Sequence, residues 1–334
     1  SELEIPNEYN ESNYKEIPTQ KFRIDNKLEK MMYELKKSKK PLLLMGMGVK
    51  CSDSVKLAKK LIEITNIPTA FTWPVSDILP YNHDLYVGRP GVVAKRNANI
   101  TIQNSDFLLS IGARLDRIVT AFNPENFAKN AKLFCVDVDR AELQKHPKRF
   151  RTILSDAGFF IENLLEKINK VKYVNTNLRW NKKCLDLKKK YGKNIFSKKT
   201  KFSVYQVVEN LSKIIPKHSI IITGSSGLSI EVFHTHFINK LGQKIIINSE
   251  GLGSMGYGFP SLLGAAFTQN QELFLFESDG SAMMNLQELQ TLKTNKIKAK
   301  IFIINNSGYV SIKNTQKNYF GGRFLGVDKN SGIE

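Results

Sequence analysis

Short apolar runs alternate with segments of helical period along most of the chain. The apolar runs have the length of buried strands and lie at 41–45, 67–72, 106–111, 132–137, 219–223, 244–248, 272–276 and 299–304. The segments between them repeat apolar residues every three or four positions and lie at 24–40, 55–65, 94–103, 158–170, 204–215, 228–237, 259–268 and 286–294. Continuous apolar strands separated by helices predict parallel sheets covered on both faces.

One interruption of this alternation divides the chain into parts. We expect an extended leader or interdomain linker over 1–24, a central α/β domain over 25–170, a basic linker helix over 171–200 and a second α/β domain over 201–334. Both domains are predicted to be doubly wound parallel sheets, the first of them Rossmann-like. After Asn305 the pattern gives way to a Gly-rich loop region, so the second domain is expected to be incomplete at its C-terminal end.

The charge of the chain is concentrated in the predicted linker. The chain has 50 Lys and Arg against 31 Asp and Glu, and ten of the basic residues lie between Arg179 and Lys201 with a single acid. Apolar residues recur at helical spacing in the same stretch, namely Trp180, Cys184, Leu187 and Tyr191. This pattern predicts an amphipathic helix with a solvated lysine face. No recognised nucleic-acid module surrounds it, so no nucleic-acid partner is expected.

Cysteine, histidine and apolar patterns exclude several classes of protein. Cys51, Cys135 and Cys184 lie far apart without a CxxC pair, which predicts neither a disulfide framework nor a zinc site and favours the reducing cytoplasm. His234 and His236 are two positions apart on a predicted helix and face different directions, so we interpret them as surface or core residues. No apolar run reaches the ~18 residues of a membrane span, and no membrane partner is expected.

Small or oxygen-bearing residues follow four strands of the second domain. These turns lie at 223–227, 249–256, 277–281 and 305–309. Ligands of an open parallel sheet bind where the strands deliver their carboxyl ends. Glycine turns that open helices expose backbone N–H groups suited to a diphosphate. Asp279 and Asn306 offer the hard oxygen donors that suit Mg²⁺, so the turns together predict a site for a metal-bound diphosphate.

Taken jointly, these turns resemble the thiamine-diphosphate-dependent 2-oxo acid decarboxylase and carboligase family, in its acetolactate synthase-like branch. The signature of that family is Gly-Asp-Gly, then a helix and a strand, then Asn-Asn. Here Ser278-Asp-Gly is followed by a predicted helix, a predicted strand and Asn-Asn at 305–306, so Ser278 replaces the first glycine. The segment 251–260, Gly-Leu-Gly-Ser-Met-Gly-Tyr-Gly-Phe-Pro, is similar to the family's segment beneath the thiazolium ring.

The resemblance implies a role for each matching residue. It implies that Asp279, Asn306 and the backbone carbonyl of Gly308 hold Mg²⁺. Met255 would bend the thiamine diphosphate, and the carbonyl of Gly253 would accept a hydrogen bond from its 4′-amino group. The other cofactor-binding residues that it implies are Gly224, Ser225, Ser226, Ser254, Gly280, Ser281 and Tyr309.

The first domain resembles the central domain of the same family, in which some members bind FAD. The turns that carry this resemblance lie at 88–91, 110–117 and 136–139. The residues themselves argue against a dinucleotide. The segment Gly-Met-Gly at 46–48 lacks the third glycine of the dinucleotide motif, and no acid for a ribose follows the strand that ends at Thr72. FAD is therefore not favoured, and we interpret the glycines of 46–48 as packing turns.

The activity implied by the resemblance is that of an enzyme, a lyase or transferase dependent on thiamine diphosphate and magnesium. It would decarboxylate a 2-oxo acid such as pyruvate and transfer the two-carbon acyl unit to an acceptor carbonyl, as a homodimer or homotetramer. Acyl transfer to a nucleotide-linked keto sugar and a noncatalytic cofactor-binding subunit are the alternatives. The family's pyrimidine domain supplies a Glu that nothing here matches, so we expect this chain to be a portion of a longer protein and to be inactive alone.

Overall fold

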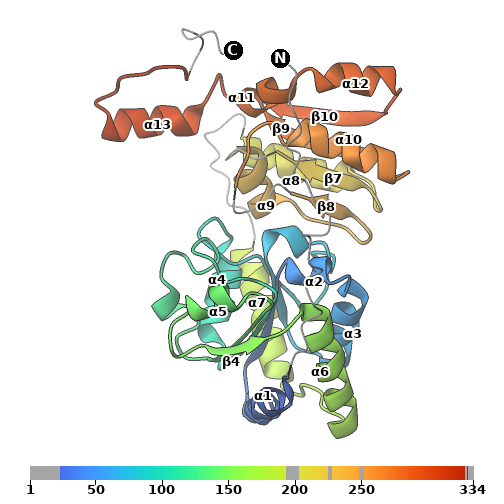
Figure 1. Cartoon of the computed structure of the whole chain (residues 1–334), viewed down its shortest axis with the longest axis vertical. Coiled ribbons are helices and arrows are strands. Elements are labelled where there is room, and N and C mark those ends of the chain that lie inside the picture. Colours follow the sequence, from blue (N-terminus) through green and yellow to red (C-terminus); the bar gives the residue numbers. More distant parts are fainter. Residues whose placement is uncertain (1–22, 193–202, 225–227, 248–251, 328, 330–334) are drawn as a thin grey trace, which may run out of the picture.

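The computed structural model describes residues 23–192, 203–224, 228–247, 252–327 and 329. They form two α/β domains, stacked along the long axis of the molecule (Figure 1). Every strand pairing in both sheets is parallel, as the alternation of apolar runs and helices predicts. No helix of the described part is long and apolar enough to cross a membrane. The predictions for 1–22 and 193–202 lie outside the described residues.

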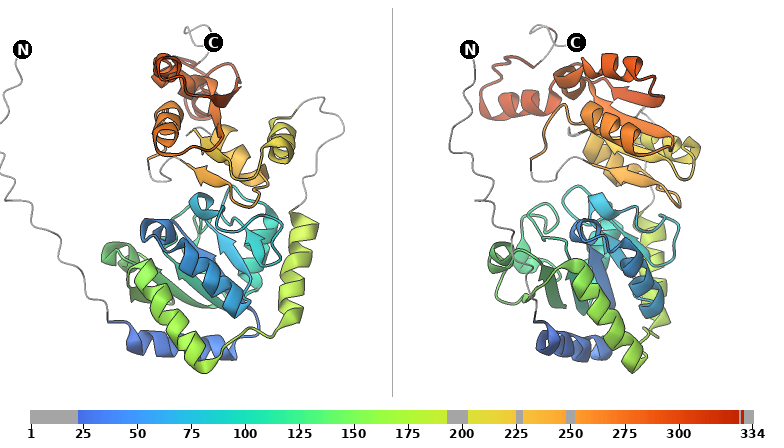
Figure 2. Two further views of the ribbon diagram at one scale, coloured as in Figure 1. Left: turned by 90° about the vertical axis from the view of Figure 1, so that its right-hand side faces the viewer. Right: turned by 45° about the vertical axis from the view of Figure 1, so that its right-hand side comes forward.

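The central domain has a six-stranded sheet in the order β3-β2-β1-β4-β5-β6. Its strands are β1 (Pro41–Met45), β2 (Thr69–Phe71), β3 (Tyr86–Gly88), β4 (Phe107–Ile111), β5 (Lys132–Asp137) and β6 (Arg151–Leu154). Its helices are α1 (Asp25–Lys37), α2 (Gly48–Cys51), α3 (Val55–Thr65), α4 (Arg96–Asn104), α5 (Arg140–Gln144) and α6 (Ala157–Val171). Side chains of β1 enter two cores: Leu43 packs with α1, α3 and α6, and Leu44 packs with α4 and α5. The domain is therefore doubly wound (Figure 2).

The second domain has a four-stranded sheet in the order β10-β9-β7-β8. Its strands are β7 (Ile220–Thr223), β8 (Lys244–Ile246), β9 (Leu273–Ser278) and β10 (Ala299–Ile304). Its helices are α8 (Val204–Ile214), α9 (Phe233–His236), α10 (Gly258–Thr268), α11 (Asp279–Ala282) and α12 (Glu288–Thr294). Ile221 faces the core beneath α8 and α9, and Ile222 faces the core beneath α10 and α12. Apolar residues on both faces of each strand therefore place this sheet between two helical layers.

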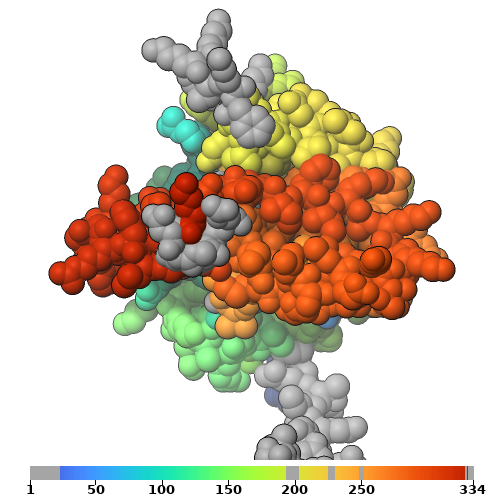
Figure 3. Space-filling model, turned by 90° about the horizontal axis from the view of Figure 1, so that it is seen from above, coloured from blue at the N-terminus to red at the C-terminus, as the bar shows by residue number. Residues whose placement is uncertain are grey.

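The sequence pattern is wrong or incomplete at several elements. A helix, α13 (Val310–Tyr319), lies within the predicted Gly-rich loop region and projects from the side of the domain (Figures 1 and 3). The described glycines of that region flank the helix, at 308 on one side and at 321, 322 and 326 on the other. The predicted helix 228–237 is divided into a π-helical turn, Leu228–Val232, and α9. The short strands β3 and β6 were not predicted, because three or four residues give too little alternation to recognise.

The basic linker contains the predicted amphipathic helix, α7 (Leu178–Tyr191). Trp180, Cys184 and Leu187 are buried as the spacing predicts, and the Trp180 Nε1–H donates a hydrogen bond to the Pro41 carbonyl. Lys188 contradicts the predicted solvated lysine face, since only 8% of it is exposed. Its ammonium donates to the backbone carbonyls of Tyr81 and His83, which replace the water that burial removes.

Hydrogen bonds join the two domains directly. The Asn239 side-chain amide donates to the carbonyls of Ser76 at 3.2 Å and Leu79 at 2.8 Å. The Ile245 backbone N–H donates to Asp77 at 2.8 Å. The turn after β2 is therefore fixed to the edge of the second sheet, and the clefts between the domains have defined walls.

Candidate functional site

Asp279 lies where β9 ends and α11 begins, and 7% of it is exposed. Its Oδ2 accepts hydrogen bonds from the backbone N–H groups of Asn306, at 3.2 Å, and Gly308, at 2.8 Å. Strands β9 and β10 are adjacent and parallel, so the turns that follow them meet at the same edge of the sheet. Gly308 has φ +114°, a conformation open mainly to glycine, which lets its N–H reach the carboxylate.

The Asn306 side chain contacts a polar atom of each of the other two residues. The terminal amide atom of Asn306 lies 2.6 Å from the Gly308 carbonyl oxygen and 3.2 Å from Asp279 Oδ1. With the amide nitrogen in that position, the side chain donates to both oxygens. With the amide oxygen there, it lies against two further oxygens, and a cation bound between them would offset their repulsion. A carboxylate, an amide oxygen and a backbone carbonyl suit a hard divalent cation, so the residues present fit Mg²⁺.

Close packing on the other side of Asp279 connects the neighbouring turns. A Cβ atom on Gly280 would lie 2.3 Å from Cε1 of Tyr309, whose hydroxyl donates to the Gly280 carbonyl at 3.2 Å. Ser281 Oγ accepts a hydrogen bond from the backbone N–H of Gly256 at 2.8 Å. The turn after β9 is thus fixed to the turn after β10 and to the loop before α10.

Glu277 was not predicted as a site residue, yet its carboxyl group lies at the centre of these turns. The residue is fully buried, and Oε1 accepts a hydrogen bond from the Ser278 N–H at 2.9 Å. A Cβ atom on Gly224 would lie 1.9 Å from Oε1, and one on Gly258 would lie 2.3 Å from Oε2. Burial raises the pKa of this carboxyl group. Gly224, which we expected to contact the cofactor, therefore packs against Glu277.

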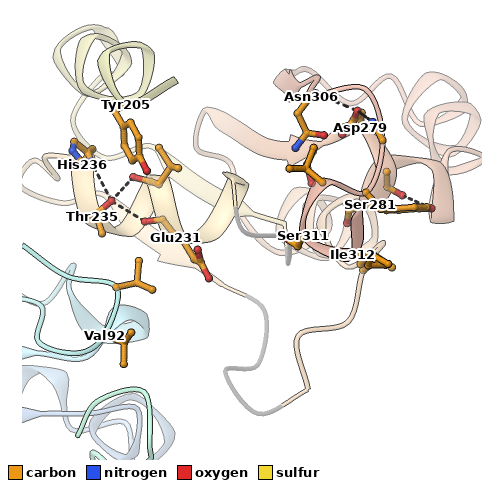
Figure 4. A pocket seen from close by; sticks show the side chains of 18 of the residues that line it. Val92, Tyr205, Glu231, Thr235, His236, Asp279, Ser281, Asn306, Ser311 and Ile312 are labelled. Carbon is orange, nitrogen blue, oxygen red and sulfur yellow. Dashed lines mark hydrogen bonds between the residues drawn. The ribbon is translucent and has the colours of Figure 1, made fainter. Parts of the chain in front are cut away.

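A cavity of about 680 Å³ opens beside Asp279, between the two domains. Asp279, Ser281 and Asn306 lie on one side of it, and Tyr205, Thr235 and His236 lie opposite, as Figure 4 shows. Burial, with the nearby cations Lys95 and Arg89, lowers the pKa of His236 to about 4, so its ring is neutral at physiological pH. The cavity therefore has an oxygen-rich wall that suits a cation and a second wall of mixed polar groups.

The other predicted site residues lie in different surroundings. Met255 lines the 680 Å³ cavity, while Gly253 borders a neighbouring cavity of about 310 Å³ with φ +58°. Ser254 is exposed. Ser225 and Ser226 lie outside the described residues. The roles of all five toward a cofactor remain predictions.

The two histidines agree with their interpretation as surface or core residues. His234 is completely buried, with its ring stacked on Trp73 of the central domain at a centroid distance of 5.2 Å. His236 borders the cavity, and its Nδ1 lies 2.7 Å from the hydroxyl of Thr235. The sequence did not predict that both rings would lie at the boundary between the domains.

Two family models match the chain. Residues 28–164 match "Thiamine pyrophosphate enzyme, central domain", and residues 227–333 match "Thiamine pyrophosphate enzyme, C-terminal TPP binding domain". Together they account for most of both sheets and for the turns around Asp279. The chain belongs to the thiamine pyrophosphate enzymes.

The similar curated proteins are named acetolactate synthases. The large subunit from Lactococcus lactis is 30% identical over 298 residues, which cover 89% of this chain and 51% of the relative. The isozyme 1 large subunit from Escherichia coli is 28% identical over 284 residues, 85% of this chain and 49% of the relative. Acetolactate synthase 1 from Nicotiana tabacum is 30% identical over 284 residues, which cover 84% of this chain and 42% of the relative. The chain thus spans about half the length of the curated relatives it matches.

Proposed function

We propose that the whole protein is a thiamine-diphosphate- and Mg²⁺-dependent carboligase. It decarboxylates a 2-oxo acid such as pyruvate and transfers the two-carbon acyl unit to an acceptor carbonyl. The names of the relatives support this class of reaction. The observation that carries the proposal is the contact of the Asn306 side-chain amide with both Asp279 Oδ1 and the Gly308 carbonyl oxygen, beside a large cavity.

Different residues of the turns would bind the metal and the diphosphate. Asp279 Oδ2 is committed to two backbone N–H groups, which leaves Oδ1 for the ion. Asn306 and Gly308 supply two further oxygens, and the diphosphate and water would complete about six ligands. Gly280 and Ser281 lie at the start of α11, and backbone N–H groups at the start of a helix suit a phosphate.

Substrate would occupy the 680 Å³ cavity, with Met255 on its wall as the apolar support of the bent coenzyme. When bound, thiamine diphosphate supplies the electron sink that decarboxylation of a 2-oxo acid needs. The protein side chains orient the substrate against it and exclude water. Glu231 lines the cavity as well, and burial raises the pKa of its carboxyl group. A carboxyl group of this kind can hold or release a proton near the acceptor carbonyl.

We further infer a homodimer, in which the diphosphate site of one subunit is completed by its partner. Exposed apolar side chains on the segment that follows Asp279 support this arrangement, namely Met283, Met284, Leu286 and Leu289. These side chains follow Asp279, one of the proposed metal ligands, in the sequence. A partner subunit covering them would therefore also cover the site.

Calorimetric titration of the protein with thiamine diphosphate, with and without Mg²⁺, tests the proposal. Binding should require Mg²⁺, and Asp279→Asn should weaken it at least about tenfold because the substitution removes the charged ligand. Asp156→Asn is the matched control. Asp156 caps α6 in the central domain, so this variant should bind thiamine diphosphate normally. Binding that is independent of Mg²⁺, or equal in both variants, would overturn the proposal. Release of CO₂ from pyruvate by the whole protein tests the reaction itself.

A further inference from the structure

Three buried polar side chains line one small cavity at the boundary between the two domains. Arg89 follows β3 and Asn97 lies at the start of α4, both in the central domain, whereas His234 lies in α9 of the second domain. Arg89 is 6% exposed, Asn97 1% and His234 0%. The volume of this cavity that is open to the centre of a water molecule is about 10 Å³, about the room that one water molecule needs.

Each of the three side chains has a buried polar atom without a hydrogen-bond partner among the described residues. These atoms are Arg89 Nη1, Asn97 Oδ1 and both ring nitrogens of His234. A buried polar atom without a partner destabilises the folded state, and native proteins rarely retain several of them together. The three side chains therefore indicate a partner that lies between them.

The other contacts of these side chains hold them in place. Arg89 Nη2 donates to the Phe237 carbonyl at 2.8 Å, and Asn97 Nδ2 donates to the Val87 carbonyl at 2.6 Å. The second contact fixes the orientation of the Asn97 amide, because the opposite orientation would set Oδ1 against the carbonyl oxygen of Val87. The ring of His234 is held by its stacking contact with the central domain. A small molecule bound between the three side chains satisfies them without the loss of any of these contacts.

The chemistry of the unpartnered atoms decides which kind of molecule fits. Arg89 Nη1 only donates hydrogen bonds, and Asn97 Oδ1 only accepts them. The guanidinium would repel a cation, and the amide oxygen would repel an anion. Burial, with Arg89 and Lys50 nearby, lowers the pKa of His234 well below 6.5, so its neutral ring offers one donor and one acceptor. A neutral molecule that both donates and accepts hydrogen bonds is required, and water is the one of this size.

We propose that one water molecule is bound between Arg89, Asn97 and His234 as a permanent part of the joint between the domains. It accepts a hydrogen bond from Arg89 Nη1, donates one to Asn97 Oδ1 and forms a third with a ring nitrogen of His234. Buried water molecules usually form about three such bonds. Thr235 lines both this cavity and the 680 Å³ cavity, so the bound water supports the wall that faces Asp279. The site is separate from the proposed metal ligands and does not depend on the proposed reaction.

Two crystal structures of the protein, one of them from a crystal soaked in sodium bromide, test the site directly. We expect one peak of electron density with the height of a water molecule, about 2.7–3.2 Å from Arg89 Nη1, Asn97 Oδ1 and a ring nitrogen of His234. The soaked crystal should show no anomalous signal of bromide at this position. A bromide ion bound there overturns the proposal in favour of an anion site. The absence of ordered density between the three side chains overturns it as well.

A water molecule shared by two residues also couples them energetically, and a double-mutant cycle measures this coupling in solution. Asn97→Leu and His234→Phe nearly preserve the size of the side chain, and each removes one partner of the water. The folding equilibrium constant is measured by urea denaturation at neutral pH. Once one partner is gone, removal of the second costs less. The loss in the double variant should therefore be at least about threefold smaller than the product of the two single losses.

Thr65→Val combined with His234→Phe is the matched control pair. Thr65 is buried, and its hydroxyl donates to the Leu61 carbonyl within α3, so it shares no partner with His234. These two changes should multiply to within about twofold. A deviation in the cycle of Asn97 and His234 that is no larger than that of the control overturns the proposal. If a variant fails to fold, the two crystal structures of the unsubstituted protein decide the question.

Discussion

At the scale of single residues, the two oxygens of Asp279 have different tasks. Oδ2 fixes the backbone of the next turn, through Asn306 and Gly308, and Oδ1 lies 3.2 Å from the terminal amide atom of Asn306. The sequence could predict this pair because each residue lies in the turn that follows an apolar run, and parallel neighbouring strands end at the same edge of a sheet. The orientation of the Asn306 amide could not be predicted, since it depends on the occupant of the site.

Another important residue carried no signal of its role in the sequence. Glu277 follows the apolar run of β9 and has a buried carboxyl group that two glycines far away in the sequence accommodate. Its position depends on contacts between segments far apart in the sequence, which no local pattern reports.

His234 should make the stability of the protein depend on pH. Burial, with Arg89 and Lys50 nearby, lowers its pKa in the folded state well below the ordinary value of 6.5. The unfolded chain therefore binds a proton more readily below that value, and the folded state loses stability as pH falls. We expect His234→Phe to reduce this loss by up to about 1.4 kcal/mol per pH unit between about pH 6 and pH 5, measured by urea denaturation.

The neighbouring ring supplies the control for that experiment. The pKa of His236 is also lowered, to about 4, so His236→Phe should remove a separate part of the same slope. An unchanged slope in His234→Phe would contradict the account of a neutral, buried ring against Trp73.

At the scale of elements, long apolar strands were predicted best. The runs at β1, β5 and β10 agree with the structure residue for residue. Burial on both faces accounts for β1, where every residue is buried, whereas β10 is partly exposed and is recognised by its apolar residues 301–304. Helix α13 was missed because its residues are mostly polar and none is buried, so it has no apolar face to recognise. The π-helical turn before α9 was missed because its residues have ordinary helical spacing.

The turn between β1 and α2 offers a direct test of the packing interpretation of its glycines. A Cβ atom on Gly46 would lie 2.1 Å from the Ala113 Cα, and the Gly48 N–H donates to the Gly112 carbonyl at 2.9 Å. The two backbones approach so closely that no side chain fits between them. Gly46→Ala should therefore lower the free energy of unfolding by about 1–3 kcal/mol or more, measured by urea denaturation.

Gly264 in α10 is the matched control for that substitution. A Cβ atom there would meet nothing within 4 Å, and the residue lies inside a helix. Gly264→Ala should raise the free energy of unfolding by about 0.5–1 kcal/mol, since alanine favours the helix. If both variants change stability in the same direction, the close approach at Gly46 is not the cause.

At the scale of the whole molecule, the fold class followed from the sequence but the joint between the domains did not. Alternating strands and helices predicted two parallel α/β units, which the structure and the matched family models confirm. The hydrogen bonds of Asn239 and the stacking of His234 on Trp73 fix the two units against each other. That joint completes the cavity, which residues 92–95 of the central domain line together with the proposed metal ligands of the second domain.

The central claim is that a divalent cation and the diphosphate of a thiamine coenzyme meet at Asp279, Asn306 and Gly308. Anomalous X-ray scattering from crystals of the protein grown with thiamine diphosphate and Mn²⁺ tests it most directly. We predict one strong peak about 2–2.3 Å from Asp279 Oδ1, the Asn306 amide oxygen and the Gly308 carbonyl oxygen. A peak at other residues, or bound thiamine diphosphate with no ion at Asp279, would contradict the account.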